Sequence, residues 1–271
     1  MKFLWKSRTA AVLVVGLGAF GCQGYIDYLK ARSELNRGVN AFSRSDYAFA
    51  IEHFEKAIDL DPEFLEARQY LASSYMMQYV PGAESLENEA VAENALVGFL
   101  DVLDRNEDNE PALASIAILY FNMRRMVDAR EWYAKLLEKF PENKDAYYTL
   151  GVIAWTETYQ PRLMVRAGLG MKPEDPGPIK DDDARHELAE LNLPVVEEGL
   201  ENLKRVLEID PEHDPAMAYI NLLYRELADI SETKEDYEKH TAMANEWSLK
   251  SLDTRKKKAE AATAETFQDE S

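Results

Sequence analysis

Cysteine is nearly absent from this sequence: Cys22 is the only one among 271 residues. A single thiol excludes an intrachain disulfide and any zinc site built mainly on cysteine. Glycine and proline are scarce too, with 12 and 11 residues, which excludes a collagen-like or low-complexity chain. The hydrophobic fraction of 46% is large enough for a sizeable core, so a folded protein is expected.

Basic side chains are in the minority. The sequence holds 31 Lys and Arg against 50 Asp and Glu, which gives a formal net charge of −19 at pH 7. Binding to nucleic acid requires clustered cations that replace phosphate counterions, so no nucleic-acid partner is predicted. The one dense basic run, residues 255–258, is explained by cations that complement the dipole near a helix end.

Catalytic motifs are also missing. The sequence contains no H-E-x-x-H, G-x-S-x-G or G-x-x-x-x-G-K pattern. The acidic run at 181–183 lacks the glycine and glutamate of a calcium loop, because His186 and Asn192 stand at those positions. The histidines form no ligand pair and are expected at surfaces or turns; they are His53, His186, His213 and His240. We therefore predict no enzymatic activity, metal site or cofactor.

The N-terminus has the layout of a secretory signal. A basic start at residues 2–8 precedes an apolar run from Thr9 to Gly21. These 13 residues, at the rise of an α-helix, are too short to cross a bilayer core of about 30 Å. The segment Ala19-Phe20-Gly21-Cys22 resembles a bacterial lipobox, in which the signal is removed and the cysteine is acylated. The alternative is an ordinary signal peptide cleaved after Gly21.

This resemblance implies a lipoprotein signal peptide at residues 1–21 and a lipidated N-terminus with a short tether at 22–27. The acyl chains, palmitate among them, are expected on Cys22. Two or three chains anchor a protein stably, whereas a single chain binds a membrane only marginally. Gln23 follows the cysteine, whereas an aspartate there retains enterobacterial lipoproteins at the inner membrane. The resemblance therefore implies a location in the cell envelope, on the periplasmic side of the outer membrane.

The rest of the sequence is helical and repetitive. From about Tyr25, apolar residues recur at intervals of three and four without strand-like alternation. Two sets share the spacing 12, 4, 3 and 5; they are Gly38, Ala50, Phe54, Ala57 and Pro62, and Ala117, Ala129, Tyr133, Leu136 and Pro141. In this pattern small residues allow two helices to cross closely, an aromatic ring fills the adjoining space, and proline ends the second helix.

The spacing resembles the tetratricopeptide repeat (TPR), a helix–turn–helix unit of 34 residues. Repeat ends at residues 62, 107, 141 and 211 lie 45, 34 and 70 residues apart, so one interval equals the period and two exceed it by 11 and 36. The resemblance implies an all-α fold, a right-handed α-solenoid of about five helix pairs over residues 28–252. A helical bundle with chance spacing is the alternative.

Departures from the period predict local differences. The second and fifth repeats are longer by 11 residues, close to three helical turns, so their helices are expected to lengthen without rotating the buried face. The fourth repeat gains an insertion at 161–196, whose first part, 161–180, is too rich in proline and glycine for one continuous helix. A short helix to about Asn192 and a restart near Pro194 should follow. Residues 253–271 are predicted to be a helix end and a disordered tail.

The 161–180 segment carries six apolar residues, more than a solvated loop requires. We expect it to be ordered and to pack near Trp155 and Tyr159, partly covering the binding groove. Arg162 and Arg166 should then face acids of neighbouring helices or of a partner. A disordered surface loop is the alternative, because closing a long loop adds little entropic cost.

The resemblance also implies where a partner binds, since the first helix of each TPR pair lines a concave face. Groove-facing offsets carried over to this sequence select a largely apolar set in which methionine adds adaptability. The predicted partner-binding residues are Arg32, Gln69, Met76, Met77, Phe121, Asn122, Tyr148, Trp155, Arg162 and Arg225, with Phe42 and Thr156 beside them. Chaperone-binding relatives hold a terminal carboxylate with Lys and Asn on this face; only Asn122 matches, so that role is not predicted. Burial of this face by the chain itself is the alternative.

The function predicted from these features is that of a membrane-anchored TPR scaffold that binds another, unidentified protein of the bacterial cell envelope. Partner classes implied by resemblance are envelope assembly machines, pilus or secretion components and peptidoglycan enzymes. The alternative is a binder of a small molecule or glycan in a pocket between the fourth repeat and its insertion. Trp155, Tyr159 and Arg162 would form that pocket, with Arg162 and Arg166 as anion contacts.

Overall fold

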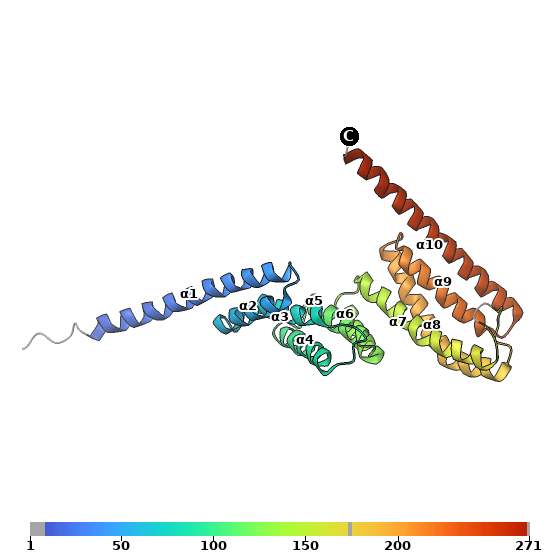
Figure 1. The fold of residues 1–271 in the computed structure, drawn as a ribbon, viewed down its shortest axis with the longest axis horizontal. Coiled ribbons are helices and arrows are strands. Elements are labelled where there is room, and N and C mark those ends of the chain that lie inside the picture. Colours follow the sequence, from blue (N-terminus) through green and yellow to red (C-terminus); the bar gives the residue numbers. More distant parts are fainter. Residues whose placement is uncertain (1–8, 173–174, 270–271) are drawn as a thin grey trace, which may run out of the picture. The chain divides into compact units, whose positions relative to one another are not determined.

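The computed structural model describes the backbone of residues 9–172 and 175–269, and the side chains of 24–172 and 175–263. Within these residues the chain forms ten helices and no strand (Figure 1). They are α1 (Thr9–Phe42), α2 (Tyr47–Leu60), α3 (Leu65–Gln78), α4 (Leu86–Arg105), α5 (Glu110–Asn122), α6 (Met126–Lys139), α7 (Lys144–Gly168), α8 (Asp182–Ile209), α9 (Asp214–Asp229) and α10 (Lys234–Asp269). In chain order these make five helix pairs, and the predicted all-α fold is confirmed.

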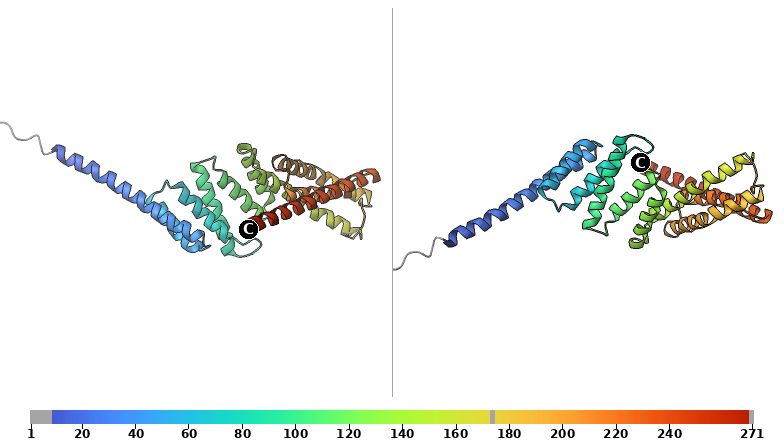
Figure 2. Two further views of the ribbon diagram at one scale, coloured as in Figure 1. Left: turned by 90° about the horizontal axis from the view of Figure 1, so that it is seen from above. Right: turned by 90° about the horizontal axis from the view of Figure 1, so that it is seen from below.

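The helices form two compact units, an N-terminal unit (Met1–Trp132) and a C-terminal unit (Tyr133–Ser271). In the N-terminal unit, α1 packs on α2, α2 on α3, α3 on α4 and α4 on α5. In the C-terminal unit, α7 packs on both α8 and α9, and α10 packs on α9. Within their own units, the start of α1 extends beyond α2 and the end of α10 extends beyond α9 (Figures 1 and 2).

The residues of the repeat pattern lie in the cores. Ala50, Phe54 and Ala129 are fully buried, as packing residues should be. The Phe54 ring stacks on Tyr70 at 5.4 Å and occupies the space that a side chain at Gly38 would need. The glycine is therefore required by the close crossing of α1 and α2, which is the role that the repeat pattern predicts for it.

Helix starts follow the capping preferences of short polar residues. Six helices begin after a short polar residue whose side chain accepts the backbone N–H three positions on; these caps are Asp46, Ser85, Asn109, Asn143, Asp181 and Thr233. His213 caps α9 in the same way. Each cap satisfies one of the N–H groups that a helix start leaves unpaired. The helix start expected at the 181–183 acidic run is confirmed.

The prediction that 161–180 is not one continuous helix is confirmed, but the first helix of the fourth repeat extends into this segment. Helix α7 continues through Pro161 to Gly168, and only residues after Gly168 leave the helix. A proline inside a helix removes one hydrogen bond and costs about 3 kcal/mol or more. The next two turns offset this cost, because Arg162 and Arg166 make ion pairs with α9.

The predicted break near Pro194 is wrong, since α8 runs unbroken from Asp182 to Ile209. Leu188 and Val196, eight residues apart and on one face, are both buried on either side of the proline. Just before it, the Asn192 amide donates to the Thr158 carbonyl oxygen of α7 at 3.1 Å. Packing on both sides therefore holds the helix together where sequence rules predict an interruption.

The second repeat accommodates its extra residues partly in a loop, not only in longer helices as predicted. Residues 79–85 connect α3 to a lengthened α4. Asn88 is buried at the base of this loop, where its Nδ2 donates to the carbonyl oxygens of Val80 and Ala83, both at 2.9 Å. Its Oδ1 accepts the Val80 N–H at 2.8 Å. One buried amide thus replaces the backbone hydrogen bonds that a helix would supply.

The C-terminal tail also differs from the prediction, because α10 continues to Asp269. Ion pairs four residues apart, Lys257 with Asp253 at 2.7 Å and Lys256 with Glu260 at 3.8 Å, support the helix past the core. The alanines that follow have the highest helix propensity of all residues. The basic run at 255–258 therefore lies within the helix and not at its end.

Candidate functional site

An aromatic row crosses the face shared by α7 and α9 in the C-terminal unit. Tyr148, Trp155 and Tyr159 come from α7, and Tyr219 comes from α9. The Tyr219 ring lies 5.8 Å from Tyr148 and 5.6 Å from Trp155, and Trp155 lies 4.9 Å from Tyr159. All four side chains are half-buried, so part of each ring reaches solvent. Such rings offer a large contact area at a small cost in conformational entropy.

Sequence reasoning identified Tyr148, Trp155 and Tyr159 but missed Tyr219. The repeat positions expected to face the groove select Arg225 on α9. They do not include Tyr219, which lies six residues earlier. Of the 161–180 segment, which the sequence predicts to pack near Trp155 and Tyr159, Arg162 lies against the Tyr159 ring, whereas the ring partners of Trp155 are Tyr159 and Tyr219. The row is therefore formed by the helix pairs themselves and is left partly open.

Arg162 continues the aromatic row into a buried ion-pair cluster. Its guanidinium carbon lies 5.4 Å from the centre of the Tyr159 ring. Its Nε lies 2.8 Å from a Glu226 oxygen, and its NH1 donates to Asp229 at 2.7 Å. Arg166 donates to the other Asp229 oxygen at 2.8 Å. Two arginines of α7 thus face two acids of α9, as expected from the sequence, and the charge of Arg162, one of the predicted partner-binding residues, is paired within the chain.

Arg166 also fastens the loop that follows α7. Its side chain is only 2% exposed, and its NH2 donates to the carbonyl oxygens of Lys172 at 2.8 Å and Asp175 at 2.6 Å. Further along, the Ile179 N–H donates to the Asp229 carbonyl oxygen at 2.9 Å. The ordering predicted for this segment is thus seen in its described part, but at the corner between α9 and α10. With their charges paired to the acids of α9, Arg162 and Arg166 are not the free anion contacts that the alternative function requires.

Glu226 is the least compensated member of the cluster. Its side chain is 1% exposed, and neither carboxylate oxygen has a hydrogen-bond partner among the described residues. The contact with Arg162 Nε brings the charges close without hydrogen-bond geometry. Burial raises the pKa of Glu226 from 4.5 to about 7; the Arg162 charge opposes this shift and the Asp229 charge adds to it.

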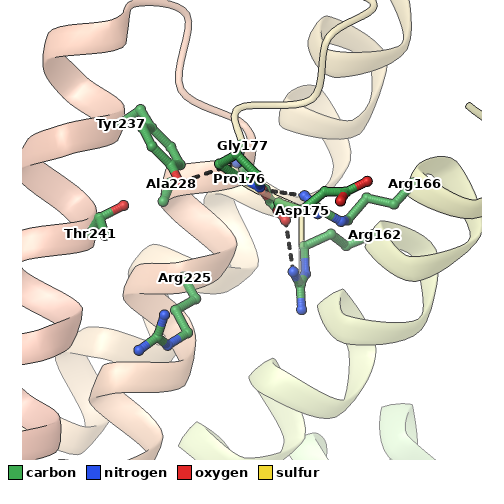
Figure 3. Close-up of a pocket in the computed structure, with 10 residues that line it drawn as sticks. Arg162, Arg166, Asp175, Pro176, Gly177, Arg225, Ala228, Tyr237 and Thr241 are labelled. Carbon is green, nitrogen blue, oxygen red and sulfur yellow. Dashed lines mark hydrogen bonds and ion pairs between the residues drawn. The ribbon is translucent and has the colours of Figure 1, made fainter. Parts of the chain in front are cut away.

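A cavity of about 350 Å³ opens beside the cluster (Figure 3). Arg162, Arg166 and the loop residues 175–177 form one side, and α9 and α10 form the other with Arg225, Tyr237 and Thr241. The Gly177 N–H donates to the Tyr237 hydroxyl at 3.1 Å, which closes one end. The fourth repeat and its insertion thus do enclose a pocket, but with the fifth helix pair and without Trp155 or Tyr159.

The predicted binding residues of the N-terminal unit lie on α1, α3 and α5 but do not form one cluster. Arg32 donates to the Tyr28 hydroxyl at 2.7 Å and lies over the Phe64 ring. Gln69 accepts a hydrogen bond from the Asn109 side chain at 3.4 Å. The others are Met76 and Phe121, half-buried, Met77, 54% exposed, and Asn122, which lines a separate cavity of about 520 Å³ with the 82–84 loop.

The remaining described residues singled out in the sequence lie outside the aromatic row and the cavity. Phe42 packs on Tyr47 and Tyr70, and the Thr156 hydroxyl donates to its own helix. The surface position expected for His53 is wrong, because His53 is buried 2.5 Å from Glu34, whereas His213 caps α9 at a turn. The Cys22 side chain lies outside the described residues.

The part of the chain that the structure describes contains neither a candidate metal cluster nor a helix suited to span a membrane. Within the described ranges, no three His, Cys, Asp or Glu side chains are grouped in a way that could hold a metal ion. Among the helices described, none combines the length and apolarity needed to cross a bilayer.

Comparison with known proteins places the fold. No family model matches the sequence, and no curated protein matches it. A crystal structure of MamA superposes with a TM-score of 0.56 at 15% identity, covering 85% of this chain and 94% of that one. MamA from Desulfovibrio magneticus RS-1 gives 0.55 at 14% identity, covering 84% and 96%. YrrB, a TPR protein with an unusual peptide-binding site, gives 0.50 at 14% identity, covering 82% and 90%. The chain therefore has the fold of TPR proteins.

Proposed function

We propose that this protein is a scaffold that binds another protein through the aromatic row of its C-terminal unit. The observation that supports this proposal is the row itself: four contacting rings, half-buried, on the face shared by the first helices of two TPR pairs. Tyrosine and tryptophan are enriched among the residues that contribute most to protein–protein binding. YrrB, which shares the fold, has a peptide-binding site.

We further propose that the scaffold is anchored through acyl chains on Cys22 in the bacterial cell envelope, at the periplasmic side of the outer membrane. The basic start, the apolar run and the position of the only cysteine support this proposal. The net charge of −19 disfavours direct attraction to anionic lipid surfaces. The acyl chains would then supply the membrane affinity that the folded part lacks.

The double variant Trp155→Ala with Tyr219→Ala tests the aromatic row. We expect it to lose the protein that crosslinks to the wild type in native envelopes, because both variants remove ring area from the centre of the row. The readout is mass spectrometry of crosslinked material, with circular dichroism to confirm folding. Phe49→Ala removes a 44% exposed ring of α2 and should leave crosslinking unchanged. Equal crosslinking by the double variant and the wild type would show that the partner does not bind the aromatic row of α7 and α9.

The variant Cys22→Ala tests the anchor. It should abolish incorporation of labelled palmitate and shift the protein from the membrane fraction to the soluble fraction, because no other residue offers a thiol. Fractionation of native cells with and without labelling measures both effects. A cleaved, unlabelled protein that still sediments with membranes would contradict lipid anchoring and leave the binding role of the aromatic row untouched.

A second candidate function is the binding of a small molecule or glycan in the cavity beside Arg166. The cavity volume of about 350 Å³ supports this candidate, because it falls within the range of small-ligand sites. The cavity is lined by residues of α7, the 175–177 loop, α9 and α10. Stabilisation of the unit by a panel of metabolites and sugars tests this candidate.

A further inference from the structure

One arginine of the cavity keeps a charge that no acid compensates. In the described part of the chain, no carboxylate oxygen lies within ion-pair distance of Arg225. Two neutral amides hold it instead: its Nε donates to Asn221 Oδ1 at 3.1 Å and its NH2 to Asn245 Oδ1 at 3.2 Å. A guanidinium carries five N–H donors, so three remain without a protein partner among these residues. The two amides orient the Arg225 guanidinium but do not neutralise its charge, so the group is preorganised to bind an anion from solution.

Polar residues on two adjacent helices surround this guanidinium. Both sets repeat every four residues, so each occupies one helix face; they are Asn221, Arg225 and Asp229 on α9, and Tyr237, Thr241 and Asn245 on α10. Asn245 touches Arg225, and Tyr237 meets the 175–177 loop at the other end. Figure 3 shows Arg225, Thr241 and Tyr237 along one wall of the cavity. The Thr241 and Tyr237 hydroxyls, neither of which has a described acceptor, add donors beside Arg225.

The other charged side chains that line the cavity are Arg162, Arg166, Asp175 and Asp229. Arg162 and Arg166 are paired with the acids of α9. Asp175 lies across from Arg225 on the loop, where its carboxylate accepts the Lys172 N–H at 2.8 Å. We therefore expect an incoming anion to contact the wall formed by α9 and α10. The negative charge of Asp175 would repel that anion and weaken its binding.

We propose that this wall binds an oxyanion, a carboxylate or phosphate group of a small ligand, with Arg225 as the main contact. The planar fork of arginine matches two oxygens of either group, and the hydroxyls of Tyr237 and Thr241 supply further donors. This inference rests on the second candidate function, that the cavity holds a ligand. It is independent of the aromatic row and of the anchor at Cys22.

Calorimetric titration with succinate, with inorganic phosphate and with neutral maltotriose tests the proposal, all at one ionic strength. Wild-type protein should bind succinate or phosphate at millimolar concentration, and the stronger of the two identifies the group. Arg225→Gln should weaken that binding at least about tenfold, in keeping with the loss of a charge-assisted contact. Arg44→Gln removes the same charge from an exposed position between α1 and α2 and should change nothing.

Asp175→Asn sharpens the test. Its amide oxygen can still accept the Lys172 N–H, but it removes a negative charge that faces the site, so an oxyanion should bind about two- to tenfold more tightly. Weaker binding in this variant, or equal binding by Arg225→Gln and wild type, would overturn the proposal. Binding of maltotriose alone would overturn it while retaining the cavity as a ligand site. No binding of any probe would count against both.

Discussion

Replacing Asp229 by alanine is expected to lower the free energy of unfolding of the C-terminal unit by about 3–5 kcal/mol, the cost typical of breaking a buried ion pair. Asp229 is only 7% exposed at its side chain and receives Arg162 at 2.7 Å and Arg166 at 2.8 Å. Its loss leaves two buried guanidinium groups with one acid, Glu226, which is itself poorly compensated. The same carboxylate connects α7 to α9, so the change also weakens the anchoring of the helix turns after Pro161.

Urea denaturation, followed by circular dichroism and tryptophan fluorescence, measures this loss. The matched control is Asp253→Ala, which removes a carboxylate paired with Lys257 at 2.7 Å where both side chains are mostly exposed. Little change is expected there, since exposed ion pairs contribute little. A loss for Asp229→Ala no larger than that of the control would show that water reaches the cluster and compensates it.

The regular part of the fold could be predicted from the sequence because its signal is local. Small residues such as Gly38 and Ala50 recur at fixed spacing, and each marks a helix crossing that the structure contains. The exceptions involve Pro161 and Pro194, where local rules predict breaks. Both helices continue because distant residues hold them, the acids of α9 in one case and the α7 contact of Asn192 in the other. Such compensation depends on tertiary contacts that periodicity does not encode.

The candidate site was predictable to a similar degree. Offsets within single helices selected Tyr148, Trp155 and Arg225, because those positions depend only on helical phase. They missed Tyr219, which joins the row through its distance from Trp155 across two helices. Helical phase also could not distinguish an arginine that is paired with an acid from one that is not. Arg162 forms an ion pair with Asp229, whereas Arg225 is hydrogen-bonded to the amide of Asn245. That difference is set by which acids of α9 face α7, a property of packing and not of spacing.

The stability of the C-terminal unit is expected to fall as pH rises through neutrality, because of Glu226. An acid with a raised pKa binds its proton more tightly in the folded than in the unfolded protein. For Glu226 the values are about 7 and 4.5, so its contribution to stability is fully present below pH 4.5 and is lost as pH rises through about 7. The shift corresponds to a loss of about 2–3 kcal/mol between roughly pH 5 and 8.

The variant Glu226→Gln isolates this effect, since glutamine retains the shape and cannot ionise. Burial lowers the pKa of His213 and His240, which produces the opposite slope with pH in the same unit. Those contributions are shared by wild type and variant and cancel when the two free energies of unfolding are subtracted at each pH. The variant should therefore gain stability over wild type as pH rises from 5 to about 7, and the difference should level off toward pH 8. A difference that stays constant across this range would mean that Arg162 and Arg166 keep Glu226 ionised throughout, with the cluster acting as two full ion pairs.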